Sequence, residues 1–421
     1  MSGGRPTGPG RLATASWVTY DLANTIFALG VVGFWFSSWL VTEGHPDSYL
    51  AGAQVTAAAV VIFLAPWAGA RSDVLGKRVP TLVATTVLAV VATSLLAIGP
   101  VWLTLVMLWL AVVSVNTGSV VYDALLVDVS TEANRGHVSG IGVGVGYLGS
   151  VIGLVLGLVA IEVLDWGHDG AFRLIAAAFL VFAIPAFVFI DERPGLAHAP
   201  LPTVQDIAGR ILHSWRRASG YDGVVRFLVG RFFYTDAINT LIGGFLAIFV
   251  IDELGLDQRF FIALMGVAIA GAIVGGIGSG PLIGRFGPLR VLRFVLVIWV
   301  VAIAAGVTAA VTGVTDIAWA IGPLGGLALG ATWASARVVM VRVSPPRHLG
   351  EFYGLYATVG RFATIVGPLV WALIVDLADL PRSLAMGALG LFIAVGWFVL
   401  GKVDDRVREW TADDSLPIRS R

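Results

Sequence analysis

The stretch Asp21-Leu22-Ala23-Asn24-Thr25 recurs 215 residues later as Asp236-Ala237-Ile238-Asn239-Thr240, and both copies lie inside long apolar segments. A carboxylate at the centre of a bilayer costs at least about 2.5–3.5 kcal/mol, so an Asp in such a segment indicates a functional site. One phrase repeated at corresponding places in two halves of a chain also indicates an internal repeat. The two stretches therefore predict a membrane fold built from two related halves.

The composition supports a membrane protein. Of the 421 residues, 57% are hydrophobic and only 13% are charged, whereas soluble domains average about 25% charged residues. Apolar stretches of about 20 residues are long enough to cross a bilayer as helices. We therefore predict an all-α membrane protein with twelve transmembrane helices, near 14–40, 49–70, 79–99, 101–126, 138–163, 172–190, 224–251, 259–283, 289–311, 316–341, 350–375 and 381–401.

The distribution of basic residues predicts the orientation. Of the 27 Lys and Arg residues, 21 fall on the side of the predicted helices that carries both termini. Arg173, Arg259 and Arg382 fall on the other side, each at or close to the start of a helix, and the loops at 41–48, 164–171 and 252–258 on that side are acidic. Because basic residues gather on the cytoplasmic side, both termini are expected in the cytoplasm and the protein in the cell (inner) membrane as a multi-pass protein.

The repeat extends beyond the opening phrase. The segment 69–78 corresponds to 280–290 at an offset of 211, and Val127–Ser130 with the glycines that follow corresponds to Val341–Ser344 at an offset of 214. Two pseudo-symmetric six-helix bundles in the same orientation are therefore expected. The predicted organisation is a flexible tail at 1–13, an N-terminal bundle at 14–190, a cytoplasmic linker at 191–222, a C-terminal bundle at 223–401 and a cytoplasmic tail at 402–421.

The linker contains apolar residues at helical spacing, including Val204, Ile207 and Ile211, with arginines on the polar side. This pattern favours an amphipathic helix on the cytoplasmic leaflet. A surface helix packed on the protein itself is the alternative.

These features together resemble the major facilitator superfamily. The segment Gly69-Ala-Arg-Ser-Asp73-Val-Leu-Gly76-Lys77-Arg78 is similar to the signature loop between the second and third helices of that family. The Arg that usually follows the Asp is Val74 here, and Gly284 stands at the Asp position of the second copy. The gating contact that the resemblance implies for this Asp is therefore carried over only to Asp73.

Three further stretches resemble the fungal vacuolar amino-acid effluxer (autophagy-related) family and its bacterial relatives. They are Tyr20–Thr25, Tyr122–Leu126 and the segment from Arg135 to Gly149. The resemblance covers roughly residues 17–150 and implies amino-acid efflux, although bacterial members need not share that substrate.

The polar residues of the repeat are the candidate binding groups for substrate or protons. Asp21, Asn24 and Thr25 have the spacing i, i+3 and i+4, so they share one helix face. Asp236, Asn239 and Thr240 repeat this face, and the two faces are expected to line one cavity from opposite halves. A structural polar network that holds these helices to their neighbours is the alternative. Proton coupling would require a buried carboxylate, for which Asp21, Asp123 and Asp236 are the candidates.

Several cations inside predicted helices need an explanation. Arg361 lies roughly twelve residues into its helix, about 18 Å along the axis, and could bind a substrate carboxylate or pair with Asp236. Asp123 and Arg337 occupy corresponding positions of the two halves, so we hypothesise that they form a cytoplasmic gate. Each could instead be bound within its own half. Arg231, nearer the cytoplasmic end, is a gating candidate or a side chain that snorkels to the interface.

Aromatic residues near these groups are candidate cavity walls, although most aromatics in membrane helices serve packing. They are Tyr20, Tyr122, Tyr147, Tyr234 and Trp333.

Other chemistry is not indicated by the sequence. The chain has no cysteine, no Gly-rich loop ending in Gly-Lys-Ser/Thr and no set of metal-binding residues at a recognised spacing. We therefore predict no enzyme activity, cofactor, metal or nucleic-acid partner.

The sequence favours a monomeric secondary transporter that exports a small polar or zwitterionic metabolite by alternating access. The expected partners are this substrate and membrane lipids, with protons as the candidate coupling ion. Two alternatives stay open at this point: an exporter of amphipathic drugs or lipids, and a non-transporting receptor or assembly factor.

Overall fold

A computed structural model describes residues 10–75, 78–131, 135–191, 203–221, 223–345 and 349–404, and every regular element in these ranges is a helix. Contacts divide the chain into two compact units. Unit 1 comprises Met1–His45 and Gly52–Ile207, and unit 2 comprises Pro46–Ala51 and Ala208–Arg421. Most of the two expected tails lies outside the described residues.

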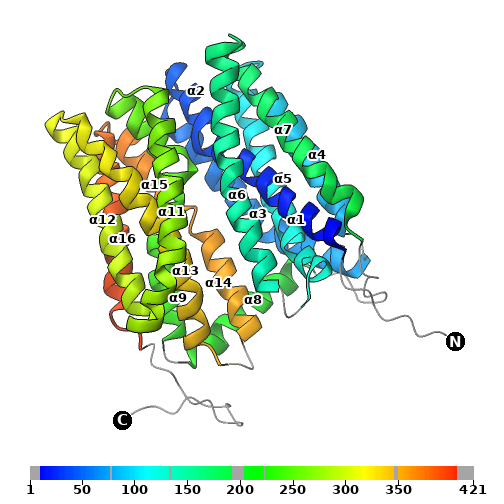
Figure 1. The fold of residues 1–421 in the computed structure, drawn as a ribbon. Coiled ribbons are helices and arrows are strands. Elements are labelled where there is room, and N and C mark those ends of the chain that lie inside the picture. The colour runs from blue at the N-terminus through cyan, green and yellow to red at the C-terminus, as the bar shows by residue number, and fades with distance from the viewer. Residues whose placement is uncertain are drawn as a thin grey trace. The chain divides into compact units, whose positions relative to one another are not determined.

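The helices of unit 1 follow one another with short connections (Figure 1). They are α1 (Arg11–Thr25), the π-helical η1 (Ile26–Trp35), α2 (Phe36–Thr42), α3 (Asp47–Leu75), α4 (Arg78–Ser94), α5 (Val101–Val129), α6 (Arg135–Leu158), η2 (Val159–Val163) and α7 (Gly167–Phe189). Helix α3 begins in the Pro46–Ala51 segment, which packs with unit 2.

Helix α8 (Val204–Ser219) lies within the expected linker and precedes the membrane-length helices of unit 2. Those elements are α9 (Val224–Thr240), η3 (Leu241–Phe245), α10 (Leu246–Ile248), η4 (Phe249–Glu253), α11 (Gln258–Phe286), α12 (Pro288–Thr312), η5 (Thr315–Ala320), α13 (Ile321–Val343), α14 (Leu349–Phe362), α15 (Val366–Ala372), η7 (Leu373–Leu377) and α16 (Arg382–Leu400).

Eleven helices among the described residues are long and apolar enough to cross a membrane. Each coincides with one of the twelve expected segments. The remaining segment, expected at 79–99, forms the 17-residue helix α4, which ends at Ser94 and is followed by turns. The all-helical membrane class is therefore confirmed, while the twelfth crossing and the cytoplasmic termini stay predictions.

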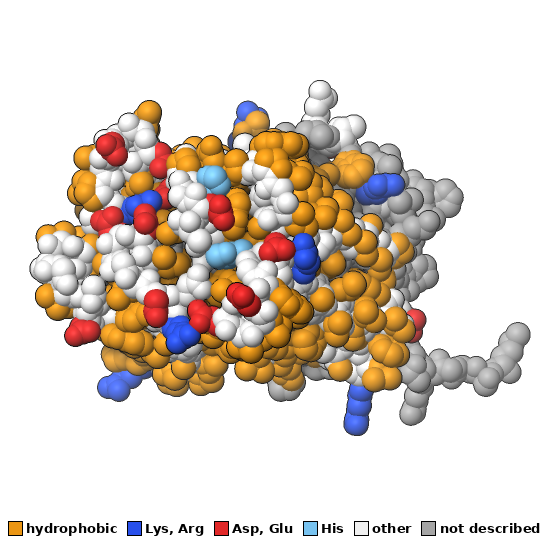
Figure 2. Space-filling model, turned by 90° about the horizontal axis from the view of Figure 1, so that it is seen from above, with side chains coloured by type: hydrophobic (Ala, Val, Ile, Leu, Met, Phe, Trp, Pro, Cys, Tyr) orange, Lys and Arg blue, Asp and Glu red, His pale blue; other side chains and the backbone are white. Residues whose placement is uncertain are grey.

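The outer faces of these helices carry large apolar side chains that water would not favour. Ile277 in unit 2 and Val188 in unit 1 have exposed fractions of 75% and 64%. Acidic side chains instead gather on an end face of the molecule (Figure 2). In unit 2, Asp257 before α11, Asp316 in the first turn of η5 and Asp379 before α16 are exposed. Large apolar side chains exposed along the helices of each unit fit a bilayer environment.

Glycine allows α1 and α6 to approach closely in unit 1. A Cβ on Gly149 would overlap the carbonyl oxygen of Leu22, and a Cβ on Gly30 would lie 2.9 Å from the Cα of Gly153. Small residues at such crossings let two backbones touch, which strengthens packing where no hydrophobic effect operates. The glycine-rich sequence of α6 therefore serves close packing against α1 and η1.

Unit 2 contains a break at the position that corresponds to this crossing. Helix α14 ends at Phe362, and α15 begins at Val366. Between them, the backbone forms turns rather than a continuous helix. Backbone groups released by such a break must find other partners at membrane depth.

Candidate functional site

In unit 1, the face formed by Asp21, Asn24 and Thr25 turns toward the glycines of α6. The Thr25 hydroxyl donates a hydrogen bond to the carbonyl oxygen of Gly146, and it also lies 3.1 Å and 3.0 Å from the carbonyl oxygens of Asp21 and Leu22. A Cβ on Gly146 would lie 2.9 Å from Oδ2 of Asp21. Asp21 and Thr25 therefore contact α6 inside their own unit, whereas Oδ1 of Asn24 is buried without a hydrogen-bond partner among the described residues.

An aromatic stack lies beside Asp21. The rings of Trp17 and Tyr122 stack with centroids 4.6 Å apart, and Tyr20 stacks on Tyr122 at 5.1 Å. The Trp17 indole donates to the Tyr122 carbonyl oxygen at 3.1 Å, and the Tyr122 hydroxyl donates to the Trp17 carbonyl oxygen at 3.2 Å. Tyr20 shares a 2.6 Å hydrogen bond with Thr86. These buried aromatics hold α1 to α5 and α4, as packing residues do.

In unit 2, the corresponding face of Asp236, Asn239 and Thr240 contacts the break between α14 and α15. Asp236 is fully buried, and its Oδ2 accepts a 2.6 Å hydrogen bond from the backbone N–H of Gly367. The Asn239 side-chain amide donates to the carbonyl oxygen of Ala363 at 2.8 Å. One side chain thus satisfies a released donor and the other a released acceptor, as a broken helix in a membrane requires.

The two faces share a place of contact but not the same hydrogen bonds, since Asn239 is hydrogen-bonded and Oδ1 of Asn24 has no partner among the described residues. Each face packs on the helix that lies about 120–130 residues further along its own unit, against Gly146 in one and against Gly360 and Gly367 in the other. Gly146 and Gly360 are separated by the repeat offset of 214. The repeated residues thus contact a helix of their own unit in both halves. Such contacts are what the alternative interpretation, a structural polar network that holds these helices to their neighbours, predicts.

A second polar face of α9 joins two residues that the sequence indicated separately, Arg231 and Tyr234, to Thr235, which it did not indicate. Arg231, Tyr234 and Thr235 have the spacing i, i+3 and i+4, so they lie on one side of the helix. All three are buried, with exposed fractions of 5%, 0% and 1%. We call this set the Arg231 face. Because the Arg231 side chain is buried, it does not snorkel to the interface.

The polar atoms of the Arg231 face lack hydrogen-bond partners among the described residues. They are Nε and Nη1 of Arg231, Oη of Tyr234 and Oγ1 of Thr235. The Arg231 guanidinium lies over the ring of Tyr356 at 3.5 Å and 5.7 Å from the centroid of the Trp333 ring. Tyr234 also interacts with the Arg231 guanidinium and with the Thr235 hydroxyl, although these contacts do not reach hydrogen-bond geometry. Unsatisfied buried polar groups are rare in proteins, so this cluster needs an explanation.

The remaining predicted residues are placed as follows. Arg361 is half-buried in the last turn of α14, and Asp123 and Arg337 are exposed on α5 and α13. Tyr147 and Trp333 are half-buried, whereas Tyr20, Tyr122 and Tyr234 are buried. Asp73 lies in α3, but its side chain is outside the described part of the chain. The gate between Asp123 and Arg337 stays a prediction.

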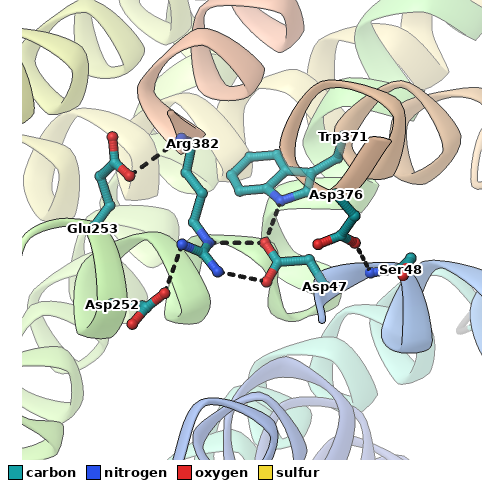
Figure 3. Close-up of polar contacts among 7 residues, drawn as sticks. All are labelled: Asp47, Ser48, Asp252, Glu253, Trp371, Asp376 and Arg382. Carbon is teal, nitrogen blue, oxygen red and sulfur yellow. Dashed lines mark hydrogen bonds and ion pairs between the residues drawn. The ribbon is translucent and has the colours of Figure 1, made fainter. Parts of the chain in front are cut away.

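An ionic network centred on Arg382 was not predicted from the sequence (Figure 3). Arg382, at the first position of α16, donates from Nε and Nη2 to both oxygens of Asp47, at 2.9 Å and 2.8 Å, and its Nη1 lies 2.6 Å from Asp252. Glu253 accepts from the backbone N–H groups of Arg382 and Ser383.

The network also fixes the first turn of α3. The Trp371 indole donates to Asp47 Oδ2 at 2.8 Å, and the backbone N–H of Ser48 donates to Asp376. The signal in the sequence was Arg382 standing at the start of a helix on a side otherwise rich in acids. Which acidic residue forms an ion pair with Arg382 depends on the tertiary structure.

Metal chemistry is not suggested by the geometry. No group of three or more His, Asp or Glu residues in the described part of the chain lies close enough to hold a metal ion.

Comparisons with known proteins agree with this architecture. The sequence matches the family model of the Major Facilitator Superfamily over residues 22–368 and 227–417. It is 26% identical over 410 residues to the uncharacterized MFS-type transporter YxiO of Bacillus subtilis, covering 93% of this chain and 94% of that protein. It is also 26% identical over 310 residues to autophagy-related protein 22-1 of Penicillium rubens, covering 66% of this chain and 50% of that protein.

Solved structures share the fold at low sequence identity. The nucleoside transporter NupG, solved as a point mutant, aligns with a TM-score of 0.70 at 11% identity, covering 93% of this chain and 99% of that one. A D-xylose-proton symporter aligns with a TM-score of 0.69 at 12% identity, covering 94% and 98%. The chain therefore belongs to the major facilitator superfamily and is a multi-pass membrane transporter, not an enzyme.

Proposed function

We propose that this transporter exports a small zwitterionic metabolite, an amino acid, from the cytoplasm by alternating access. The resemblance to the fungal autophagy-related effluxers, and the similarity to autophagy-related protein 22-1, support the substrate class. The observation that carries the proposal is the presence of buried charges of both signs on α9. Asp236 and Arg231 lie five residues apart, with exposed fractions of 0% and 5%.

A zwitterion needs both an acceptor and a donor site. Carboxylate oxygens bind ammonium groups, and guanidinium groups bind carboxylates in a planar, two-bond arrangement. Charged side chains in membrane helices are costly and usually mark a substrate or ion pathway. The protein is proposed to work as a monomer in the cell (inner) membrane, with Asp21 or Asp236 as the proton carrier if export is proton-coupled.

Transport by purified protein tests this proposal. Proteoliposomes preloaded with a single unlabelled L-amino acid should accumulate the labelled form of that amino acid by counterflow. A panel of all twenty, with a nucleoside, xylose and a fluorescent lipid as comparison compounds, identifies the class. Uptake of the lipid alone would support the amphipathic exporter instead. Absence of counterflow for every compound would favour a receptor or assembly role.

A further inference from the structure

We propose that the Arg231 face is the binding site for the carboxylate group of the transported molecule. This inference rests on the proposed function, because it assigns one end of a zwitterionic substrate to a specific cluster in unit 2. The residues that form it are Arg231, Tyr234 and Thr235 on α9, with Tyr356 on α14 as the supporting ring.

The first argument is the state of the guanidinium. Arg231 is 95% buried, yet two of its three nitrogens have no hydrogen-bond partner among the described residues. A buried guanidinium cannot lose its proton, so it must be neutralised by an anion or remain an unpaired charge. Asp236, the carboxylate next along α9, forms no ion pair with Arg231: its Oδ2 accepts from the Gly367 backbone, and its Oδ1 has no hydrogen-bond partner among the described residues. A visiting anion would supply the missing partner.

The second argument is that the Arg231 guanidinium is held in place by the Tyr356 ring. The guanidinium carbon of Arg231 lies 3.5 Å from the centroid of the Tyr356 ring, which is a cation–π contact. Gly360 permits this placement, because a Cβ there would lie 2.9 Å from Arg231 Nη2. A cation–π contact does not use an N–H group as a hydrogen-bond donor, so Nε and Nη1 of Arg231 stay available to donate. Arg231 is therefore oriented before any ligand arrives.

The third argument is the chemistry of the neighbouring groups. The hydroxyls of Tyr234 and Thr235 share the Arg231 face and are buried, and their contacts with each other and with Arg231 do not reach hydrogen-bond geometry. Each can donate a hydrogen bond, and a carboxylate can accept about four. A second cation reinforces the positive field, since Arg337 and Arg231 both act electrostatically on Tyr353 and Tyr356. The set therefore favours a small anion with several acceptor oxygens.

The ligand would enter past the partly exposed side chains of Trp333 and Tyr353, which lie on α13 and α14. Trp333 and Tyr353 are half-buried, while the Arg231 face itself is closed. A site that is closed in one conformation and opens in another is what alternating access requires.

Carboxylate-dependent thermal stabilisation of the purified full-length protein tests the site without knowledge of the substrate. The probes are the sodium salts of acetate, lactate and benzoate, each compared with sodium chloride at the same ionic strength. We expect a concentration-dependent rise in melting temperature for the wild type. Arg231→Gln should abolish it, and Arg231→Lys should weaken the apparent affinity at least about tenfold. Tyr234→Phe should weaken it less.

Arg226→Gln is the matched control, because Arg226 lies on the same helix but is exposed. It removes the same charge and should leave the carboxylate effect unchanged. Arg231→Lys keeps the charge and guards against misfolding of the Gln variant. The proposal is overturned if Arg231→Lys and Tyr234→Phe respond like the wild type, if Arg226→Gln loses the effect equally, or if inorganic phosphate stabilises the protein and carboxylates do not.

The same variants separate this inference from the proposed function. Carboxylate stabilisation that depends on Arg231, in a protein that moves no amino acid, would leave the site standing and reject the amino-acid substrate. Amino-acid counterflow that is unchanged in Arg231→Lys, and that accepts amino acids and their amides equally well, would reject the site alone.

Discussion

Arg382 holds both carboxylate oxygens of Asp47, with Nε and Nη2 at 2.9 Å and 2.8 Å, although the two residues are separated by 335 positions in the chain. The Asp47 side chain is 1% exposed and the Arg382 side chain 21%. The pair is therefore a bidentate and largely buried ion pair, a type that is strong only when its geometry is complete.

Loss of Arg382 should destabilise the protein markedly. Arg382→Ala leaves the Asp47 carboxylate buried with Trp371 as its remaining side-chain partner, so we expect a cost of about 3 kcal/mol. The double variant with Asp47→Ala should cost less than the sum of the two single changes. Thermal unfolding in detergent, followed by tryptophan fluorescence, measures these differences.

Arg173→Ala is the control for Arg382. Arg173 also pairs with an Asp near the start of a helix, but the side chains of this pair are 52% and 37% exposed. Exposed pairs contribute little, so this change should leave the melting temperature nearly unchanged. Equal effects of the two substitutions would contradict the importance given to burial.

Gly149→Ala should disrupt the α1–α6 contact. The added methyl group would overlap the Leu22 backbone, which cannot move as a flexible side chain can, so we expect a cost of roughly 1–3 kcal/mol. Gly144→Ala in the same helix meets no atom within 4 Å and should be tolerated. Expression level and melting temperature of the two variants give the comparison. Similar behaviour would show that α6 does not need glycine at this crossing.

Asp236→Asn should separate exchange from proton-driven transport. Asn keeps an oxygen that can accept from Gly367 but cannot release a proton, so we expect counterflow to persist while accumulation driven by a pH gradient disappears. Asp316→Asn, at an exposed position, should retain both activities. Accumulation that still follows the pH gradient in Asp236→Asn would exclude this residue as the proton carrier. Asp21→Asn would then be the next variant to measure.

The orientation in the membrane can be measured directly because the chain has no native cysteine. A single cysteine replacing Asp316 should react with a membrane-impermeant maleimide in intact cells, since the basic residues place that connection outside. A single cysteine replacing Ser219 should react only after permeabilisation. The reverse labelling pattern would overturn the predicted topology.

The fold was predictable because hydropathy and internal repetition act over whole segments. Helix positions followed from apolar length, and the repeated phrase marked the two halves. The partners of that phrase were not predictable. Helical spacing places Asp236 and Asn239 on one face, but it does not give the rotation of α9 or show that α14 ends at Phe362 and leaves backbone groups for that face to satisfy.

The same limit explains why neither the Arg231 face nor the Arg382 network was predicted as a set. The hydropathy of a sequence window is the same whether the Arg231 side chain reaches the membrane interface or folds back onto Tyr356. Hydropathy therefore cannot distinguish the two placements. Nor can it choose among the acids available to Arg382. Only the tertiary structure brings Asp47 and Asp252 to the same guanidinium.

The six residues Pro46–Ala51 pack with unit 2 although the chain on either side of them belongs to unit 1. A gene cut within the 191–222 linker would therefore not yield two self-sufficient halves. A fragment beginning after the cut would present Arg382 and Trp371 without Asp47, the acceptor that both of them share. Functional recovery from two co-expressed fragments would depend on how well the first fragment restores that single turn of helix.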